Sequence, residues 1–310
     1  MKWWPFGASS GDVGNAEAGL YGKLPCSAEF LRIHCLRGSG AAYRGWIDRC
    51  VEFGGGLDAC WNLLLRPEST SGWIVARIRP SADAGGRRRF PITVFVSNGL
   101  DGSATSAGER AQAAGMIWRR LATLDERLDD ATEDELESLL ARATPAAADG
   151  GAEVRPPEAV AWPSSSSATS RLTGMDDDLL ARRLWWGVRR TRAGGGQASS
   201  PGTLLPLWPD EDVVSQSIRW IEWLQRQGVD PGIGDRLALA VPQGDPSLGL
   251  RVLARPVDRG DFDLWLGAEA AAMPARPDSP AFEGLLDRVR RSGLLHAGTA
   301  ALDSIEVGAM

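Results

Sequence analysis

Three strand-like runs in close succession constrain the fold of this chain more than any other feature. They cover residues 59–65, 73–79 and 90–96, and they are rich in aliphatic, β-branched and aromatic side chains. The connections, residues 68–72 and 81–88, consist of turn-forming residues. Strands joined by short connections pair with their neighbours in antiparallel order. We therefore predict an antiparallel meander.

Helical patterns flank this meander along the chain. Apolar residues at helical spacing predict one helix over about 30–36 and another over 41–53. Further helices are predicted over 108–124 and 132–143, the latter opening with a Thr-Glu-Asp-Glu capping box. The fold class is therefore expected to be α/β, with a mixed, largely antiparallel sheet flanked by helices.

Composition divides the chain into three parts. Residues 1–18 are rich in glycine, serine and alanine and are expected to form a flexible leader. Residues 19–192 should form the main domain, within which the Ala/Gly/Pro/Ser-rich segment 144–170 is predicted to be a loop or linker. Residues 200–310 are expected to form a C-terminal α+β module.

The C-terminal part repeats the order of predicted elements in the first part. A helical segment carries Trp220-Ile221-Glu222, much as the earlier one carries Trp46-Ile47-Asp48. The strands predicted at 237–241, 250–255 and 262–266 match the three strands of the meander in their order. A last helix is predicted to begin at Ser279-Pro280 and end at Gly293. The second half is either a degenerate repeat of the first or a distinct module.

The composition favours protein contacts over chemistry. The chain has 13 tryptophans but only two histidines, and tryptophan is enriched at protein interfaces while histidine is the commonest general base. The net charge of −6 argues against nucleic-acid binding. The four cysteines lie in the first 60 residues, which indicates reduced thiols. No run of 18 apolar residues or signal-peptide core is present, so we expect a cytoplasmic protein without membrane insertion.

Motifs that would indicate catalysis lack their structural context. Gly7-Ala8-Ser9-Ser10-Gly11 matches a nucleophile pattern, but no strand precedes it. The cysteines and His34 lack the close pair spacing of zinc sites. We therefore predict that the protein is not an enzyme and has no metal and no cofactor.

Several motifs, taken in order, resemble the TagF/ImpM family. Gly19-Leu20-Tyr21-Gly22-Lys23-Leu24-Pro25 followed by Glu29-Phe30-Leu31-Arg32 is similar to the family's opening GxxGKLPxxGDFxxR pattern. Trp46-Ile47, Trp61, Trp73 and the run from Gly86 to Thr93 resemble its helix and its GRxFPLT strand, and Leu184-Trp185-Trp186-Gly187 resembles its late LWW element. Ala28-Glu29 replaces the usual Gly-Asp, and residues beyond about 195 fall outside the resemblance.

The resemblance implies an α/β domain and a non-catalytic regulatory role in a bacterial type VI secretion system. Members of this family are post-translational repressors thought to bind an FHA-domain scaffold protein. The partner-binding residues expected here carry the resembling motifs, and they are Lys23, Glu29, Phe30, Arg32, Arg87, Arg88, Arg89 and Phe90. The alternatives are a structural adaptor of the secretion machine and a hydrolase or phosphatase of unknown type.

Overall fold

The computed structural model describes most of the predicted elements. The described residues are 15–25, 27, 29–52, 57, 59–68, 70, 72–82, 90–100, 106–144, 175–192, 203–208, 211–228, 238–243, 248–253, 257 and 275–307. Among them, no helix is both long enough and apolar enough to cross a membrane.

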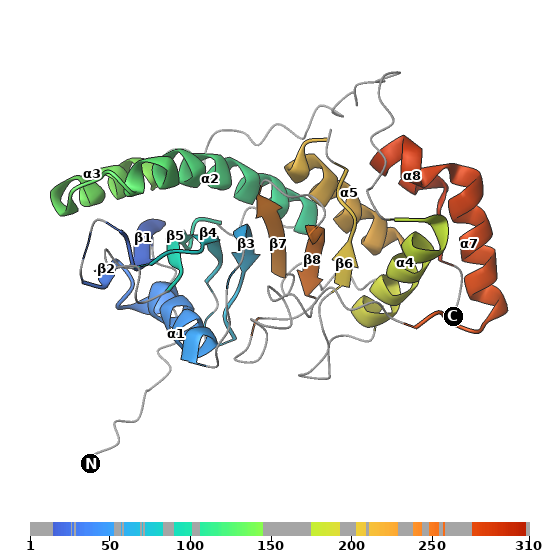
Figure 1. The fold of residues 1–310 in the computed structure, drawn as a ribbon, viewed down its shortest axis with the longest axis horizontal. Helices are drawn as coiled ribbons and strands as arrows, with labels where there is room; N and C mark the ends of the chain where they lie inside the picture. The colour runs from blue at the N-terminus through green and yellow to red at the C-terminus, as the bar shows by residue number, and fades with distance from the viewer. Residues whose placement is uncertain are drawn as a thin grey trace, which may run out of the picture.

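The described strands form a single eight-stranded sheet that is antiparallel throughout (Figure 1). Its spatial order is β2-β1-β5-β4-β3-β7-β8-β6. The strands are β1 (Glu17–Gly22), β2 (Leu31–Ile33), β3 (Cys60–Leu65), β4 (Ile74–Arg79), β5 (Ile92–Ser97), β6 (Thr203–Leu205), β7 (Ala238–Gln243) and β8 (Leu250–Leu253). The short connections between β3, β4 and β5 produce the predicted meander, and β7 pairs with β3 to continue the sheet.

Helices cover both faces of this sheet. The helices are α1 (Gly38–Glu52), α2 (Ala107–Leu128), α3 (Glu133–Ala143), α4 (Asp177–Arg192), α5 (Val213–Arg226), α7 (Pro280–Ser292) and α8 (Leu294–Ala297), followed by the 3₁₀ helix η5 (Gly298–Ser304). α1 packs on one face, whereas α2 and α5 lie on the other (Figure 1). α4 and α7 pack together beside β6, at the far end of the sheet.

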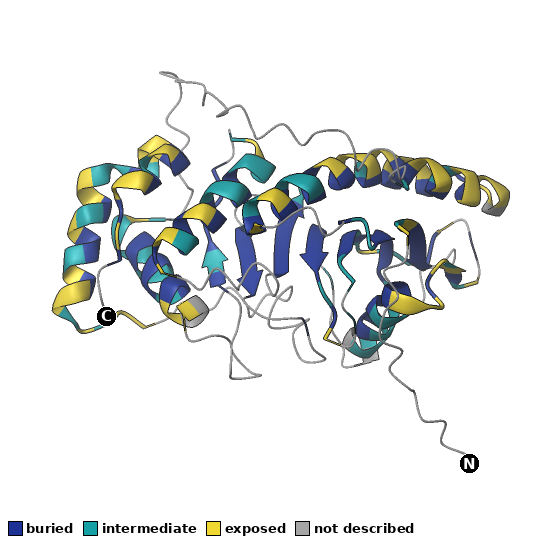
Figure 2. Ribbon diagram, turned by 180° about the vertical axis from the view of Figure 1, so that it is seen from behind, coloured by how far each residue is buried: buried dark blue, intermediate teal, exposed yellow. Residues whose placement is uncertain are grey.

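Two hydrophobic cores lie on opposite faces of the sheet. The smaller core, on the α1 face, contains Tyr43 and Trp46 packed over Trp61 and Phe95. The larger one joins α2, α3, α4, α5 and α7 to the other face. Figure 2 shows the strands buried throughout their central part while the outer sides of the helices are exposed. Each fully buried side chain of this size contributes about 1.5–3 kcal/mol, so these two layers are the main source of stability.

Local sequence signals set the ends of several helices. Ser106 accepts a hydrogen bond from the backbone N–H of Glu109, whose carboxylate accepts one from the Ser106 N–H, so α2 begins with a capping box. Ser279 caps α7 by accepting a hydrogen bond from the N–H of Phe282, and Gly293 ends that helix with a φ of 61°. A left-handed φ favours glycine because it has no Cβ. The predicted start and end of α7 are confirmed.

The helix predicted over about 30–36 is wrong, because this segment forms strand β2 and the turn that follows it. Leu31 is buried, Arg32 exposed and Ile33 half-buried, which is the alternation of a strand rather than a helical face. Pairing with β1 supplies backbone hydrogen bonds that a single helical turn could not match. The sequence also did not indicate β6, which has only three residues.

The predicted division into domains stays a prediction, although strands of both proposed parts pair in the same sheet. β1 begins at Glu17, so the last two residues of the expected leader belong to this strand. Residues 1–14, the linker positions 145–170 and the strand predicted at 262–266 lie outside the described residues. For that reason the duplication also stays a prediction.

Candidate functional site

The resembling motifs meet at the β2 end of the sheet, around the ring of Phe30. The ring of Phe90, which precedes β5, packs edge-on against Phe30 with their centroids 4.6 Å apart. Tyr21 of β1 lies 6.0 Å from Phe30 and 5.6 Å from Phe90. We call these three side chains, together with Lys23 and Arg32, the β2-edge cluster.

Two cations of the β2-edge cluster lie over the Phe30 ring. Lys23 Nζ is 4.9 Å and Arg32 Cζ is 5.9 Å from its centroid, which is the geometry of cation–π contacts. The two cations differ in exposure, because Lys23 is only 2% exposed whereas Arg32 is open to solvent. The sequence motifs predicted both as site residues but did not indicate that Lys23 is buried.

Tyr21 connects the β2-edge cluster to helix α1. Its hydroxyl donates a hydrogen bond to the carboxylate of Asp48, which also lies 3.8 Å from Arg44 one helical turn earlier. Burial raises the pKa of the Tyr21 hydroxyl, and the hydrogen bond and negative charge of Asp48 raise this pKa further. Tyr21 and Asp48 were not among the predicted site residues. Tyr21 lies inside the opening motif, which could have indicated it.

The remaining predicted residues divide into exposed and undescribed ones. Glu29 is exposed, and its backbone N–H and C=O both bond to the hydroxyl of Ser27. Arg87, Arg88 and Arg89 lie outside the described residues. Just after β2, Leu36 is 64% exposed and Arg37 is also open to solvent.

Together these groups form a contact surface with an apolar centre and charged borders. The rings of Phe30 and Phe90 are half-buried against the smaller core, so their outer edges remain available. An exposed leucine and two exposed arginines lie on the adjoining strand and turn. Aromatic and arginine side chains of this kind dominate the energetics of protein interfaces.

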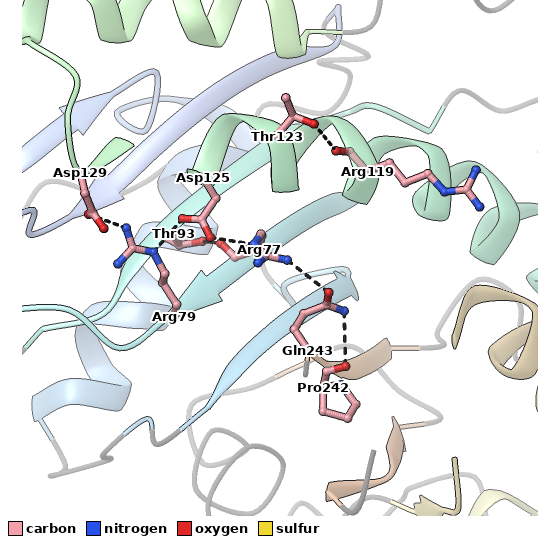
Figure 3. Close-up of polar contacts among 9 residues, drawn as sticks. All are labelled: Arg77, Arg79, Thr93, Arg119, Thr123, Asp125, Asp129, Pro242 and Gln243. Carbon is pink, nitrogen blue, oxygen red and sulfur yellow. Dashed lines mark hydrogen bonds and ion pairs between the residues drawn. The ribbon is translucent and has the colours of Figure 1, made fainter. Parts of the chain in front are cut away.

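A second polar cluster lies between the sheet and α2 (Figure 3). Asp125 of α2 is 8% exposed and accepts hydrogen bonds from Arg77 Nε at 2.7 Å and Arg79 Nε at 2.8 Å. Arg79 also reaches Asp129, and Arg77 donates to Gln243 of β7. Burial lowers the pKa of Arg79, but the hydrogen bonds that Arg79 donates to Asp125 and Asp129 outweigh this effect and raise the pKa overall. This cluster fastens α2 to β4 and β7.

A groove of about 610 Å³ runs between α2, α5 and η5. The half-exposed Met116 and Ile218 form part of its apolar lining, and Arg219 and Asp303 are among the charges at its border. In the part of the chain that the structure describes, no group of three His, Cys, Asp or Glu side chains is placed to hold a metal ion.

Comparisons with known proteins identify no family. No protein-family model and no curated protein matches the chain. Among solved structures, the chain is similar to PA0076 from Pseudomonas aeruginosa PAO1, with 14% identity and a TM-score of 0.41 over 85% of this chain and 100% of that one. A likeness at this level carries no argument about function.

Proposed function

We propose that this chain is a non-catalytic accessory protein of a bacterial type VI secretion system and works by binding another protein in the cytoplasm. The proposal combines the motif resemblance to the TagF/ImpM family with the geometry of the β2-edge cluster. The resemblance suggests post-translational repression, with an FHA-domain scaffold protein as the partner.

One observation supports the proposal most directly. Lys23, Phe30 and Arg32 belong to the opening motif and Phe90 to the later GRxFPLT-like run, yet their side chains meet around a single aromatic ring. Core packing alone does not require an exposed arginine at this position, nor the exposed Leu36 in the turn that follows. Residues that share a surface patch of this composition are suited to contact with a protein.

The proposal is tested by affinity capture of the scaffold protein from a native lysate. Arg32→Ala is the test variant because Arg32 is exposed, so its removal leaves the fold intact. Arg142→Ala is a matched control, since it removes an exposed arginine from α3. We expect the wild-type chain and Arg142→Ala to capture the FHA-domain protein and Arg32→Ala to capture at least about fivefold less.

Two results would reject parts of this proposal. If the wild-type chain captures no component of a secretion system, the functional assignment fails. If Arg32→Ala and Arg142→Ala capture equal amounts, the partner binds elsewhere and the β2-edge cluster is not the contact surface.

A further inference from the structure

The two edges of the sheet differ in how they are covered. At one end, α4 lies directly against β6, since Thr203 of β6 donates a hydrogen bond to the carbonyl of Gly187 in α4. At the other end, β2 pairs with β1 on one side, and no described strand pairs with its outer side (Figure 1). An uncovered strand edge is a template for a further strand.

Hydrogen bonds of Ala18 show which backbone groups of β2 point outward. The N–H of Ala18 donates to Thr144 Oγ1 at 3.1 Å, and its carbonyl lies 2.8 Å from His34 Nδ1. Ala18 therefore faces away from β5. Because this direction alternates along a strand, Leu20 and Gly22 also face β2.

The outward-facing residue of β2 is Arg32. Leu20 and Gly22 lie opposite Ile33 and Leu31, so these two residues of β2 bond to β1. The N–H and C=O of the intervening Arg32 then point away from β1, toward the open edge. Neither group has a hydrogen-bond partner within the described ranges.

The charge of Arg32 at this edge favours pairing with an acidic strand. The exposed carboxylates near this edge are those of Glu29 and of Glu17, which lies 3.7 Å from His34. Arg32, however, is the charged residue of β2 itself, and Arg37 in the turn that follows is also exposed. Opposite charges in directly opposed strand positions attract, and like charges repel. A second copy of β2 would place Arg32 against Arg32, so the charge disfavours pairing between two copies of this chain.

We infer that β2 receives an extended, acidic segment of the partner protein as an additional strand of the sheet. A carboxylate of that segment lies opposite Arg32, and its backbone bonds the outward N–H and C=O of Arg32. Apolar side chains of the segment contact Leu36 and the outer edge of Phe30. This inference rests on the proposed function, and it names the chemistry and binding mode of the partner.

Two variants at position 32 separate backbone pairing from side-chain contact. Arg32→Thr keeps the outward N–H but removes the charge. Arg32→Pro removes the charge and the N–H, and proline is tolerated on an edge strand where the N–H faces solvent. Circular dichroism checks that both variants fold.

The probe is the extended peptide acetyl-Thr-Val-Glu-Val-Thr-amide, with a lysine in place of its glutamate as the matched control. Binding is measured by fluorescence anisotropy of labelled peptides and by the shift and exchange protection of the Arg32 amide in NMR spectra. We expect the wild-type protein to prefer the glutamate peptide about five- to tenfold. We expect Arg32→Pro to bind it about tenfold more weakly than Arg32→Thr.

Any of three results would overturn the inference, namely no binding, no preference for the glutamate peptide, or equal affinity of Arg32→Pro and Arg32→Thr. If Arg32→Pro does not fold, Arg32→Glu replaces it, and the preference must then reverse toward the lysine peptide. Self-association through β2 would appear as a dimer in sedimentation and would also contradict the inference. Capture of the scaffold protein undiminished by Arg32→Pro rejects the inference and the β2-edge contact surface but leaves the functional assignment standing, whereas peptide binding without capture of a secretion component rejects only the functional assignment.

Discussion

The two carboxylates that bind Arg79 provide a test of what holds α2 on the sheet. Asp125 accepts from Arg79 Nε at 2.8 Å and Asp129 accepts from Arg79 Nη2 at 2.7 Å, so both bonds are equally short. They differ in burial, because the side chain of Asp125 is 8% exposed and that of Asp129 is 52% exposed. Asp129→Asn therefore removes one exposed carboxylate charge from Arg79, whereas Asp125→Asn removes the buried carboxylate charge that Arg77 and Arg79 share.

Burial should make the two substitutions unequal. Removing one partner of a buried ion pair costs about 3–5 kcal/mol, because the other charge is left uncompensated. Arg77 and Arg79 are 15% and 19% exposed, and water can partly solvate them. We therefore expect Asp125→Asn to lower the free energy of unfolding by about 2–3 kcal/mol. For Asp129→Asn we expect about 0.2–1 kcal/mol, as for other surface pairs.

The measurement is urea unfolding followed by tryptophan fluorescence, at low salt and in 1 M NaCl. The Debye length falls to about 3 Å at 1 M salt, so the small effect of Asp129→Asn should disappear there while that of Asp125→Asn persists. Equal losses for the two variants at low salt would show that burial does not govern this cluster. Loss of the Asp125→Asn effect in high salt would refute the reasoning in the same way.

Two further predictions concern packing and pH. A Cβ added at Gly115 would lie 2.5 Å from Val214 Cγ1 where α2 crosses α5, so Gly115→Ala should lower the free energy of unfolding by about 1–3 kcal/mol. Gly108→Ala in the same helix meets no atom closer than 3.9 Å and should raise it by about 0.5–1 kcal/mol in the same urea titration. Because the pKa of Tyr21 is raised in the folded protein, the folded state keeps its proton when unfolded tyrosine ionises, and stability should fall as the pH rises above about 10. Tyr21→Phe should reduce this loss of stability in unfolding curves measured from pH 8 to 11. If the free energy of unfolding falls with pH as steeply as in the wild-type protein, the prediction is wrong.

The central part of the fold could be predicted from the sequence because its elements are long enough to show a period. The strand runs that became β3, β4 and β5 lie within two residues of their predicted bounds, and both ends of α7 carry explicit capping residues. β2 and β6 have three residues each, which is too short for alternation to differ from a helical turn. Such strands are stabilised by the neighbours they pair with, and those neighbours are distant in the sequence.

In the candidate site, too, local motifs indicate some residues, whereas other contacts depend on how distant segments pack together. The motifs indicated Lys23, Phe30, Arg32 and Phe90, and the structure brings them together. The contact of Tyr21 with Asp48 depends on the position of α1 over β1, which no local pattern specifies.

Substitutions of the two cations over Phe30 can distinguish an effect on folding from an effect on binding. The ammonium of Lys23 is withdrawn from water, and a buried charge is tolerated only with compensating contacts, such as the Phe30 ring. Lys23→Ala should therefore lower the free energy of unfolding by about 1–3 kcal/mol, whereas the exposed Arg32→Ala should change it by less than about 0.5 kcal/mol. If urea unfolding shows this difference, weaker partner capture by Arg32→Ala reports on the contact itself, whereas a loss with Lys23→Ala reports first on stability. Equal destabilisation by the two variants would mean that Arg32 also supports the fold, and its role in binding would then have to be tested with Arg37→Ala.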